Sequence, residues 1–142
     1  GSIKLIPNKE FSIDFEIDFP SPVISKQSCQ LQLINGNYKT DIASARTFGF
    51  EKDVKQLRSN GLALGGSLEN AVVVGDDKIL NKEGLRFKDE FVRHKILDSI
   101  GDLYLAGAPI QGYFYGNKSG HQLNVKLLKR LFSDKSNFEY LY

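Results

Sequence analysis

Hydrophobic and polar residues alternate strictly from residue 11 to residue 19, and this is the clearest pattern in the chain. The even positions are polar, so one face of the segment suits a core and the other suits water. We therefore predict a half-buried strand that ends at Pro20-Ser-Pro22, because proline cannot donate to a sheet. Residues 29–33 alternate again before the turn signal Asn35-Gly36, so we expect a second strand that pairs nearby. The apolar positions of the first strand are Phe11, Ile13, Phe15, Ile17 and Phe19.

A helical pattern spans residues 91–105, which contain no proline and end shortly before Gly107-Ala-Pro109. At about 100° per residue, its side chains sort onto two faces. The expected core face consists of Val92, Ile96, Leu97, Ile100, Leu103 and Tyr104. The opposite, mostly polar face consists of Phe91, His94, Lys95, Asp98 and Asp102.

Shorter patterns complete the secondary structure. The last helix is expected to begin with Ser119 as its N-cap and to repeat leucine every four residues up to Leu131. Helices and strands are mixed without a regular βαβα order, so we predict an α+β fold. The remaining predicted elements are a short helix over residues 41–45, an amphipathic helix over 51–60, a buried strand over 71–74 and a strand over 110–115.

Composition limits the class of protein without identifying a function. A chain of 142 residues can bury one core, and no run approaches the roughly 20 apolar residues of a membrane span. The net charge of +2 is spread over interspersed charges, which argues against nucleic acid. Cys29 is the only cysteine, so an internal disulfide is excluded and a reducing compartment is indicated. Residues 1–2 are expected to be an expression scar on a piece of a longer protein.

The two histidines carry the candidate chemistry. His94 and Asp98 lie four residues apart, so their side chains stand on adjacent turns of the predicted helix, as two ligands of one divalent metal do. For such a spacing in isolation, a solvated face with an incidental His–Asp pair is the preferred interpretation. His121 opens the last helix, and in isolation it is interpreted as a surface residue. Asp102, one turn beyond Asp98, is the residue expected to orient and charge its imidazole.

Several runs of the sequence nevertheless resemble one family closely. They cover residues 46–50, 61–67, 74–105 and 118–124. These runs are similar to the C-terminal half of the zinc-dependent UDP-3-O-acyl-N-acetylglucosamine deacetylases of lipid A biosynthesis. The resemblance extends from about Phe11 to the C-terminus, and it favours the metal interpretation of His94 and Asp98.

The resemblance implies a role for each candidate residue. His94 and Asp98 would be two of three protein ligands to a catalytic Zn²⁺. His121, backed by Asp102, would stabilise the oxyanion and protonate the leaving amine. Contacts to the sugar, phosphate and uracil of the substrate are implied for Lys95, Lys118, Thr47, Phe48 and Phe19. A β-α-β insert at about residues 50–74 would hold the acyl chain, with walls made by Val54, Leu57, Leu62, Ala63, Gly66, Ser67, Leu68, Ala71 and Val73.

The resemblance also implies that the chain is one domain of a larger enzyme. Residues 3–142 would be the C-terminal, second domain of a cytoplasmic, Gram-negative hydrolase, with a small mixed sheet packed against two main helices. The enzyme would remove the N-acetyl group of UDP-3-O-acyl-N-acetylglucosamine. The third zinc ligand and the glutamate general base come from the family's N-terminal domain, so the zinc site here would be incomplete, the isolated chain inactive, and that domain the implied partner.

Two other interpretations stay open. The chain could be a non-catalytic module that binds a nucleotide sugar or an acyl chain. Alternatively, it could be a domain that docks onto a protein partner. A third histidine upstream of residue 1 in the parent gene would favour the enzyme over both.

Overall fold

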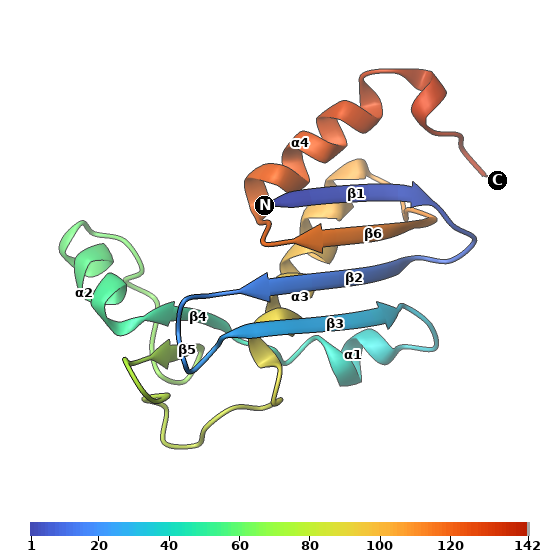
Figure 1. Cartoon of the computed structure of the whole chain (residues 1–142). Helices are drawn as coiled ribbons and strands as arrows, with labels where there is room; N and C mark the ends of the chain where they lie inside the picture. Colours follow the sequence, from blue (N-terminus) through green and yellow to red (C-terminus); the bar gives the residue numbers. More distant parts are fainter. Residues whose placement is uncertain (142) are drawn as a thin grey trace.

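A four-stranded mixed sheet forms the centre of the protein, which is described here by a computed structural model covering residues 1–141 (Figure 1). The strand order is β1-β6-β2-β3, in which β2 runs parallel to β6 and the other two neighbouring pairs are antiparallel. The predicted α+β class is therefore confirmed. The strands are β1 (Ser2–Pro7), β2 (Ser12–Asp18), β3 (Lys26–Gln32) and β6 (Gly112–Asn117).

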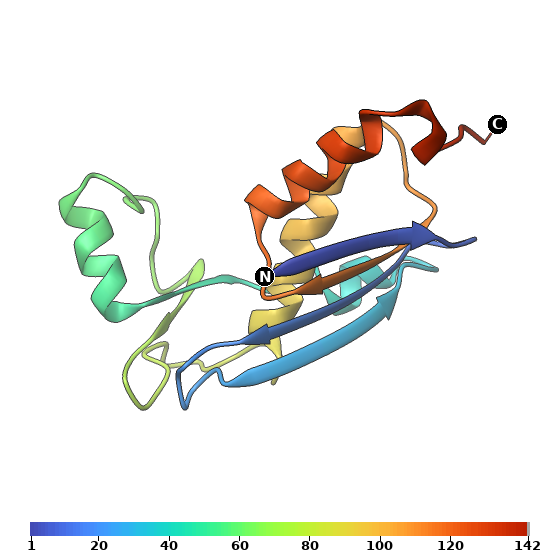
Figure 2. The same ribbon diagram turned by 45° about the horizontal axis from the view of Figure 1, so that its top comes forward.

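Two helices, α3 (Glu90–Leu103) and α4 (His121–Phe132), cover one face of this sheet (Figure 2). The helices contact each other, while α3 contacts β2 and β3, and α4 contacts β1. Each fully buried Phe or Ile at such an interface contributes about 1.5–3 kcal/mol. Among the residues without exposed surface in this core are Ile13, Phe15, Val92, Ile96 and Phe114.

A second, smaller unit follows the short helix α1 (Asn37–Asp41). It consists of β4 (Thr47–Phe50), α2 (Glu51–Ser59) and β5 (Ala71–Val74), with the two strands parallel. This is the β-α-β insert that the family resemblance implies, and it lies beside the main sheet (Figure 1). An added Cβ on Gly49 would meet the Val54 side chain at 3.4 Å, so α2 packs closely over β4. Within residues 1–141, no helix has the length and apolarity needed to cross a membrane.

The two faces of α3 differ from the helical-wheel prediction at both ends. Phe91 has no exposed surface, because Phe48 of the insert packs edge-on against its ring at a centroid distance of 4.9 Å. Tyr104, expected in the core, is 72% exposed. It opens the 3₁₀ helix η1 (Tyr104–Ala106), in which three residues complete a turn and side chains leave the α-helical register.

Two local predictions are wrong, and one strand was missed. The helix expected at residues 41–45 is α1 at residues 37–41, which begins directly after Asn35 and Gly36, both with positive φ. The edge strand β1 was not predicted. Ser119 does not cap α4: Gly120 occupies the N-cap position, and the Ser119 hydroxyl is buried without a hydrogen-bond partner. Lys118 has a φ of 48°, and this left-handed residue turns the chain just before the helix.

Candidate functional site

His94 and Asp98 face each other on adjacent turns of α3. The Nε2 atom of His94 lies 3.2 Å from Oδ1 of Asp98, and both side chains are largely buried. The other ring nitrogen, Nδ1, lies 2.9 Å from the carbonyl oxygen of Ala45. Because a carbonyl can only accept, Nδ1 must carry the proton and donate it. Nε2 is therefore the nitrogen available to a ligand.

The geometry of this pair fits two ligands of one tetrahedral Zn²⁺. With ligand bonds of about 2.0–2.2 Å, two donor atoms of such a site lie about 3.3 Å apart, close to the observed 3.2 Å. A metal-bound histidine also usually donates its second N–H to a carbonyl or carboxylate, as His94 does to Ala45. Among residues 1–141, no group of three or more His, Cys, Asp or Glu is arranged to hold a metal. Within these residues, His94 and Asp98 therefore offer two candidate donors for one metal ion.

Each member of the pair stabilises the charge of the other. Burial disfavours the imidazolium, but the hydrogen bonds with Asp98 and Ala45 and the charge of Asp98 outweigh it, so the pKa of His94 is raised. Burial likewise disfavours the carboxylate, but the hydrogen bond and charge of His94 prevail, so the pKa of Asp98 is lowered. At a pH below this raised pKa, a metal ion would have to displace a proton from Nε2 of His94 when it binds.

His121 is the first residue of α4 and forms the second pair of the site. Its Nδ1 donates to Oδ2 of Asp102 at 2.7 Å, and its Nε2 lies 3.7 Å from Oδ2 of Asp98. The side chain is 65% exposed, so Nε2 is accessible to a substrate. The structure thus places Asp102 where the sequence suggested, and it brings His94, Asp98, His121 and Asp102 into one array between α3 and α4.

Asn124 was missed by the sequence analysis although it supports this array. It has no exposed surface, and its Nδ2 donates to Oδ2 of Asp102 at 2.8 Å. The same oxygen therefore accepts hydrogen bonds from both His121 and Asn124. Asn124 lies three residues after His121 on α4, so the shared helix face was the signal that could have identified it.

The two candidate lysines differ in their surroundings. Lys118 donates to Oδ2 of Asp18 at 2.7 Å, and this hydrogen bond together with the lysine charge lowers the pKa of Asp18. Asp18 was not predicted as part of the site. Lys95 reaches the start of α4, because its Nζ would lie 3.5 Å from a Cβ added to Gly120, the neighbour of His121.

The candidate aromatic residues belong to a cluster between the sheet and the insert. The ring centroid of Phe19 lies 5.7 Å from that of Phe48 and 6.1 Å from that of Phe50. Phe19 and Phe48 are half-buried there, and Thr47 is exposed.

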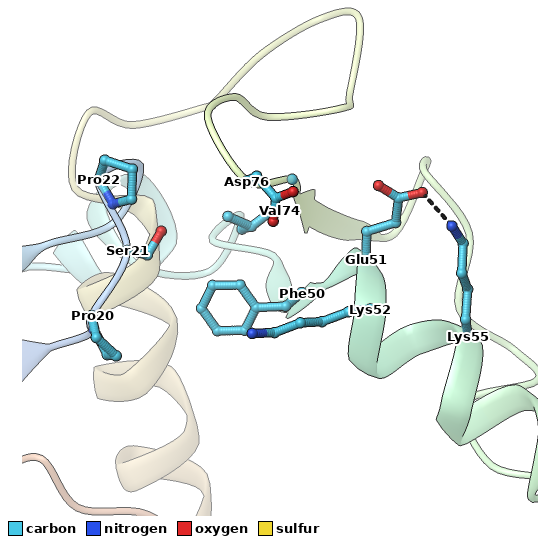
Figure 3. Close-up of a pocket in the computed structure, with 10 residues that line it drawn as sticks. Pro20, Ser21, Pro22, Phe50, Glu51, Lys52, Lys55, Val74 and Asp76 are labelled. Carbon is cyan, nitrogen blue, oxygen red and sulfur yellow. Dashed lines mark ion pairs between the residues drawn. The ribbon is translucent and has the colours of Figure 1, made fainter.

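A cavity of about 460 Å³ lies between the Pro20–Pro22 turn and the start of α2 (Figure 3). Its wall includes Phe50, with Lys52 Nζ 5.9 Å from the ring centroid, and an ion pair of 2.8 Å between Lys55 and Glu51. The residues that line the cavity therefore include apolar side chains and charges of both signs.

The predicted acyl-chain walls lie along the insert on α2, on the following loop and on β5. Several are apolar and exposed, namely Leu57, Leu62 and Leu68, and the loop adds Leu64, which the prediction omitted. Arg58 donates to the carbonyl of Gly66 at 2.8 Å and ties this loop to α2. The insert thus exposes four leucines, Leu57, Leu62, Leu64 and Leu68, which we call together the leucine surface.

A His–Asp pair spaced like two metal donors, beside a second His–Asp pair with an exposed imidazole, is a combination of side chains that metal-assisted hydrolases use. The chain belongs to the UDP-3-O-acyl N-acetylglycosamine deacetylase family, whose sequence profile matches residues 1–133.

Individual relatives agree with this assignment. The chain is 54% identical over 138 residues to the UDP-3-O-acyl-N-acetylglucosamine deacetylase of Psychrobacter cryohalolentis, covering 96% of the chain and 43% of that protein. It is 53% identical over 137 residues to the protein of the same name from Campylobacter fetus, with 96% and 47% covered. The corresponding values for Syntrophus aciditrophicus are 52% over 134 residues, with 94% and 42% covered. The chain thus spans less than half the length of these relatives.

Proposed function

We propose that the chain is the C-terminal domain of a UDP-3-O-acyl-N-acetylglucosamine deacetylase. In this proposal, the complete cytoplasmic enzyme hydrolyses the N-acetyl amide of its UDP-linked glucosamine substrate in lipid A biosynthesis. The observation that carries the proposal is the array of His94, Asp98, His121 and Asp102 within the part of the chain that matches the family. The remaining ligand and the general base would come from an N-terminal domain.

Zn²⁺ is the metal that best suits the donor set. His94 Nε2 and Asp98 would hold it, since their separation fits one tetrahedral ion and Nδ1 of His94 is already engaged by Ala45. When bound, zinc would polarise the amide carbonyl and lower the pKa of a water molecule toward about 7.

His121 would donate a proton to the reacting amide group. Attack by water on the carbonyl carbon creates an oxyanion, and cleavage of the C–N bond then leaves an amine that must gain a proton. Nδ1 is held by Asp102, so the exposed Nε2–H of the imidazolium is the group that would donate to the oxyanion and then transfer its proton to the amine. Asn124 would keep the carboxylate of Asp102 in place.

Binding of the rest of the substrate is assigned to residues around this array. Lys118 and Lys95 would contact anionic and polar groups of the UDP-sugar, and the anion would have to compete with Asp18 for Lys118 Nζ. Thr47 and Phe48 would contact the sugar, and Phe19 the uracil. The leucine surface and its small neighbours in the insert would hold the acyl chain, which is supported by their exposed apolar character.

Zinc analysis and deacetylation assays on two proteins test the proposal. The 142-residue chain should bind zinc weakly and should not deacetylate, because it offers two protein donors where a catalytic site usually has three. The full-length protein should bind about one zinc per chain and should turn over the UDP-linked substrate. Robust turnover by the isolated chain would refute the division of the site between two domains, and a full-length protein without zinc or activity would support a binding module instead.

A further inference from the structure

A second carboxylate of α3, that of Glu90, is fully buried one helical turn before His94. Its Oε1 accepts hydrogen bonds from the backbone N–H and from Nε of Arg46, both at 2.9 Å. Its Oε2 accepts from the backbone N–H of Arg86 at 2.7 Å and from Nη2 of Arg46 at 3.2 Å. Four donors therefore satisfy a carboxylate that has no contact with water, as a buried charge requires.

One peptide group joins this carboxylate to His94. The N–H of Arg46 and the C=O of Ala45 belong to the same planar peptide unit, in which they point in opposite directions. The N–H donates to Glu90, and the C=O accepts from Nδ1 of His94 at 2.9 Å. Glu90, the peptide and the His94 ring thus form a continuous chain of hydrogen bonds.

Such a chain has an electrostatic consequence. Each hydrogen bond in a low-dielectric interior polarises the next one. The negative charge of Glu90 therefore makes the Ala45 carbonyl a stronger acceptor for the Nδ1 proton of His94. It also fixes the plane of the peptide, and hence the direction in which this carbonyl points.

We propose that Glu90 is a positioning residue for His94, acting through the Ala45–Arg46 peptide. It holds the imidazole so that Nδ1 keeps its proton and Nε2 faces Asp98, the arrangement in which Nε2 binds a metal. This inference rests on the proposed zinc-binding role of His94. Carboxylates that orient a metal-bound histidine commonly bond to the ring directly. Here a peptide unit lies between them.

A purely structural ion pair would explain only part of these contacts. Arg46 has a second carboxylate partner, Glu83, at 2.9 Å, and it also donates to the carbonyl of Gly84. Glu83 is 57% exposed and pairs with Nη1 of the Arg46 side chain, whereas Glu90 also accepts from the backbone N–H of the peptide that leads to His94. Glu83 therefore provides a matched control, because it pairs with the same guanidinium without being connected to His94.

The first test measures zinc affinity in the full-length protein by competition with a chelator. Glu90→Gln keeps an acceptor oxygen and loses the charge, so we expect about 10-fold weaker binding. Glu90→Ala removes both, and we expect up to about 100-fold weaker binding. Glu83→Gln should leave the affinity unchanged. Wild-type affinity in both Glu90 variants would overturn the proposal, and so would an equal loss in Glu83→Gln.

Glu90→Ala leaves Arg46 partly unpaired and can fail to fold. The double variant Arg46→Met/Glu90→Leu replaces the buried pair with apolar side chains, an exchange that proteins often tolerate. Circular dichroism checks that it is folded. We expect its zinc affinity to fall as far as in Glu90→Ala, whereas unchanged affinity in a folded double variant would overturn the proposal.

The second test needs no metal and uses the 142-residue chain itself. The chain has two histidines, so the ¹⁵N signals of both imidazoles can be assigned. In alkaline solution, where the ring is neutral, His94 should be the Nδ1–H tautomer in the wild-type chain. The Nε2–H tautomer should gain population in the folded double variant and not in Glu83→Gln. An unchanged tautomer in the double variant would overturn the proposal even if the full-length protein bound no zinc, so the two hypotheses fail separately.

Discussion

Replacing His121 by alanine in the full-length protein tests the assigned acid most directly. A positioned general acid contributes about 10²- to 10⁴-fold to a rate, which corresponds to about 2.7–5.5 kcal/mol at 1.36 kcal/mol per tenfold change. The His121 side chain is 65% exposed, so its removal leaves no buried cavity. Asp102 keeps its hydrogen bond from Asn124. We therefore expect kcat to fall by at least about 10²-fold, while the free energy of unfolding changes by less than about 0.5 kcal/mol.

Zinc content distinguishes this role from the alternative one. Nε2 of His121 lies 3.7 Å from Oδ2 of Asp98, close enough that His121 could itself be a metal ligand. Steady-state kinetics, metal analysis and urea unfolding should be measured on His121→Ala and on Gln122→Ala, an exposed neighbour on the same helical turn that serves as the control. The acid role predicts a slow enzyme with full zinc content. Loss of the zinc would mean that His121 is a ligand, and a kcat within tenfold of the wild type would refute both roles.

Three further predictions concern the insert, the core and the metal-free pair. Replacing Gly66 or Ala71 by leucine in the full-length protein should narrow the acyl site, so that turnover of long-chain substrates falls while the zinc is retained. Normal long-chain turnover by both variants would place the acyl chain elsewhere. Gly116→Ala should lower the free energy of unfolding by about 1–3 kcal/mol, because the new Cβ would lie 2.6 Å from the buried Phe15 ring. Gly65→Ala is the control, since its new Cβ would have nothing within 4 Å, and it should leave the free energy of unfolding nearly unchanged. A denaturant titration measures both. Because the pKa of His94 is raised in the folded chain, its ionisation stabilises the fold fully below the pKa of an unfolded histidine, about 6.5, and this stabilisation is lost as the pH rises. Because the pKa of Asp98 is lowered, its stabilisation is complete above the pKa of an unfolded aspartate, about 3.9. His94→Ala should therefore destabilise the metal-free chain more at about pH 5.5 than at about pH 9. If urea titrations gave the same loss in the free energy of unfolding at both pH values, the His94–Asp98 pairing would be contradicted.

Local patterns predicted most of the elements, and tertiary contacts account for the errors. The alternation of β2 and the amphipathic pattern of α2 depend on neighbouring residues alone, and both elements form where the sequence indicates. Phe91 was assigned to the polar face because a helical wheel cannot show that Phe48, 43 positions earlier, packs on the opposite side of the helix. Ser119 was assigned as a cap because its sequence gives no sign that Lys118 would adopt a positive φ.

In the candidate site, too, contacts within one helix could be predicted from the sequence, and contacts between distant segments could not. The spacing of His94 and Asp98 follows from helix periodicity, so the pair could be found from the sequence. Asp18 and Lys118 lie 100 positions apart and meet only because β2 and β6 are neighbours in the sheet. Glu90 was missed because the predicted helix began one residue too late.

The start of α3 at Glu90 places four functional candidates at a constant spacing of four residues: Glu90, His94, Asp98 and Asp102. With 3.6 residues per turn, each step of four advances about 40° around the axis, so this row of side chains winds by about 120° from end to end. Glu90 consequently faces Arg46 in the interior, whereas Asp102 faces His121 at the start of α4. The two middle residues, His94 and Asp98, therefore lie between the buried Glu90 and the exposed His121. Helix α3 can therefore hold the two proposed metal ligands in the middle of the row and, through Asp102, orient the proposed proton donor His121 of α4, whose side chain stays exposed.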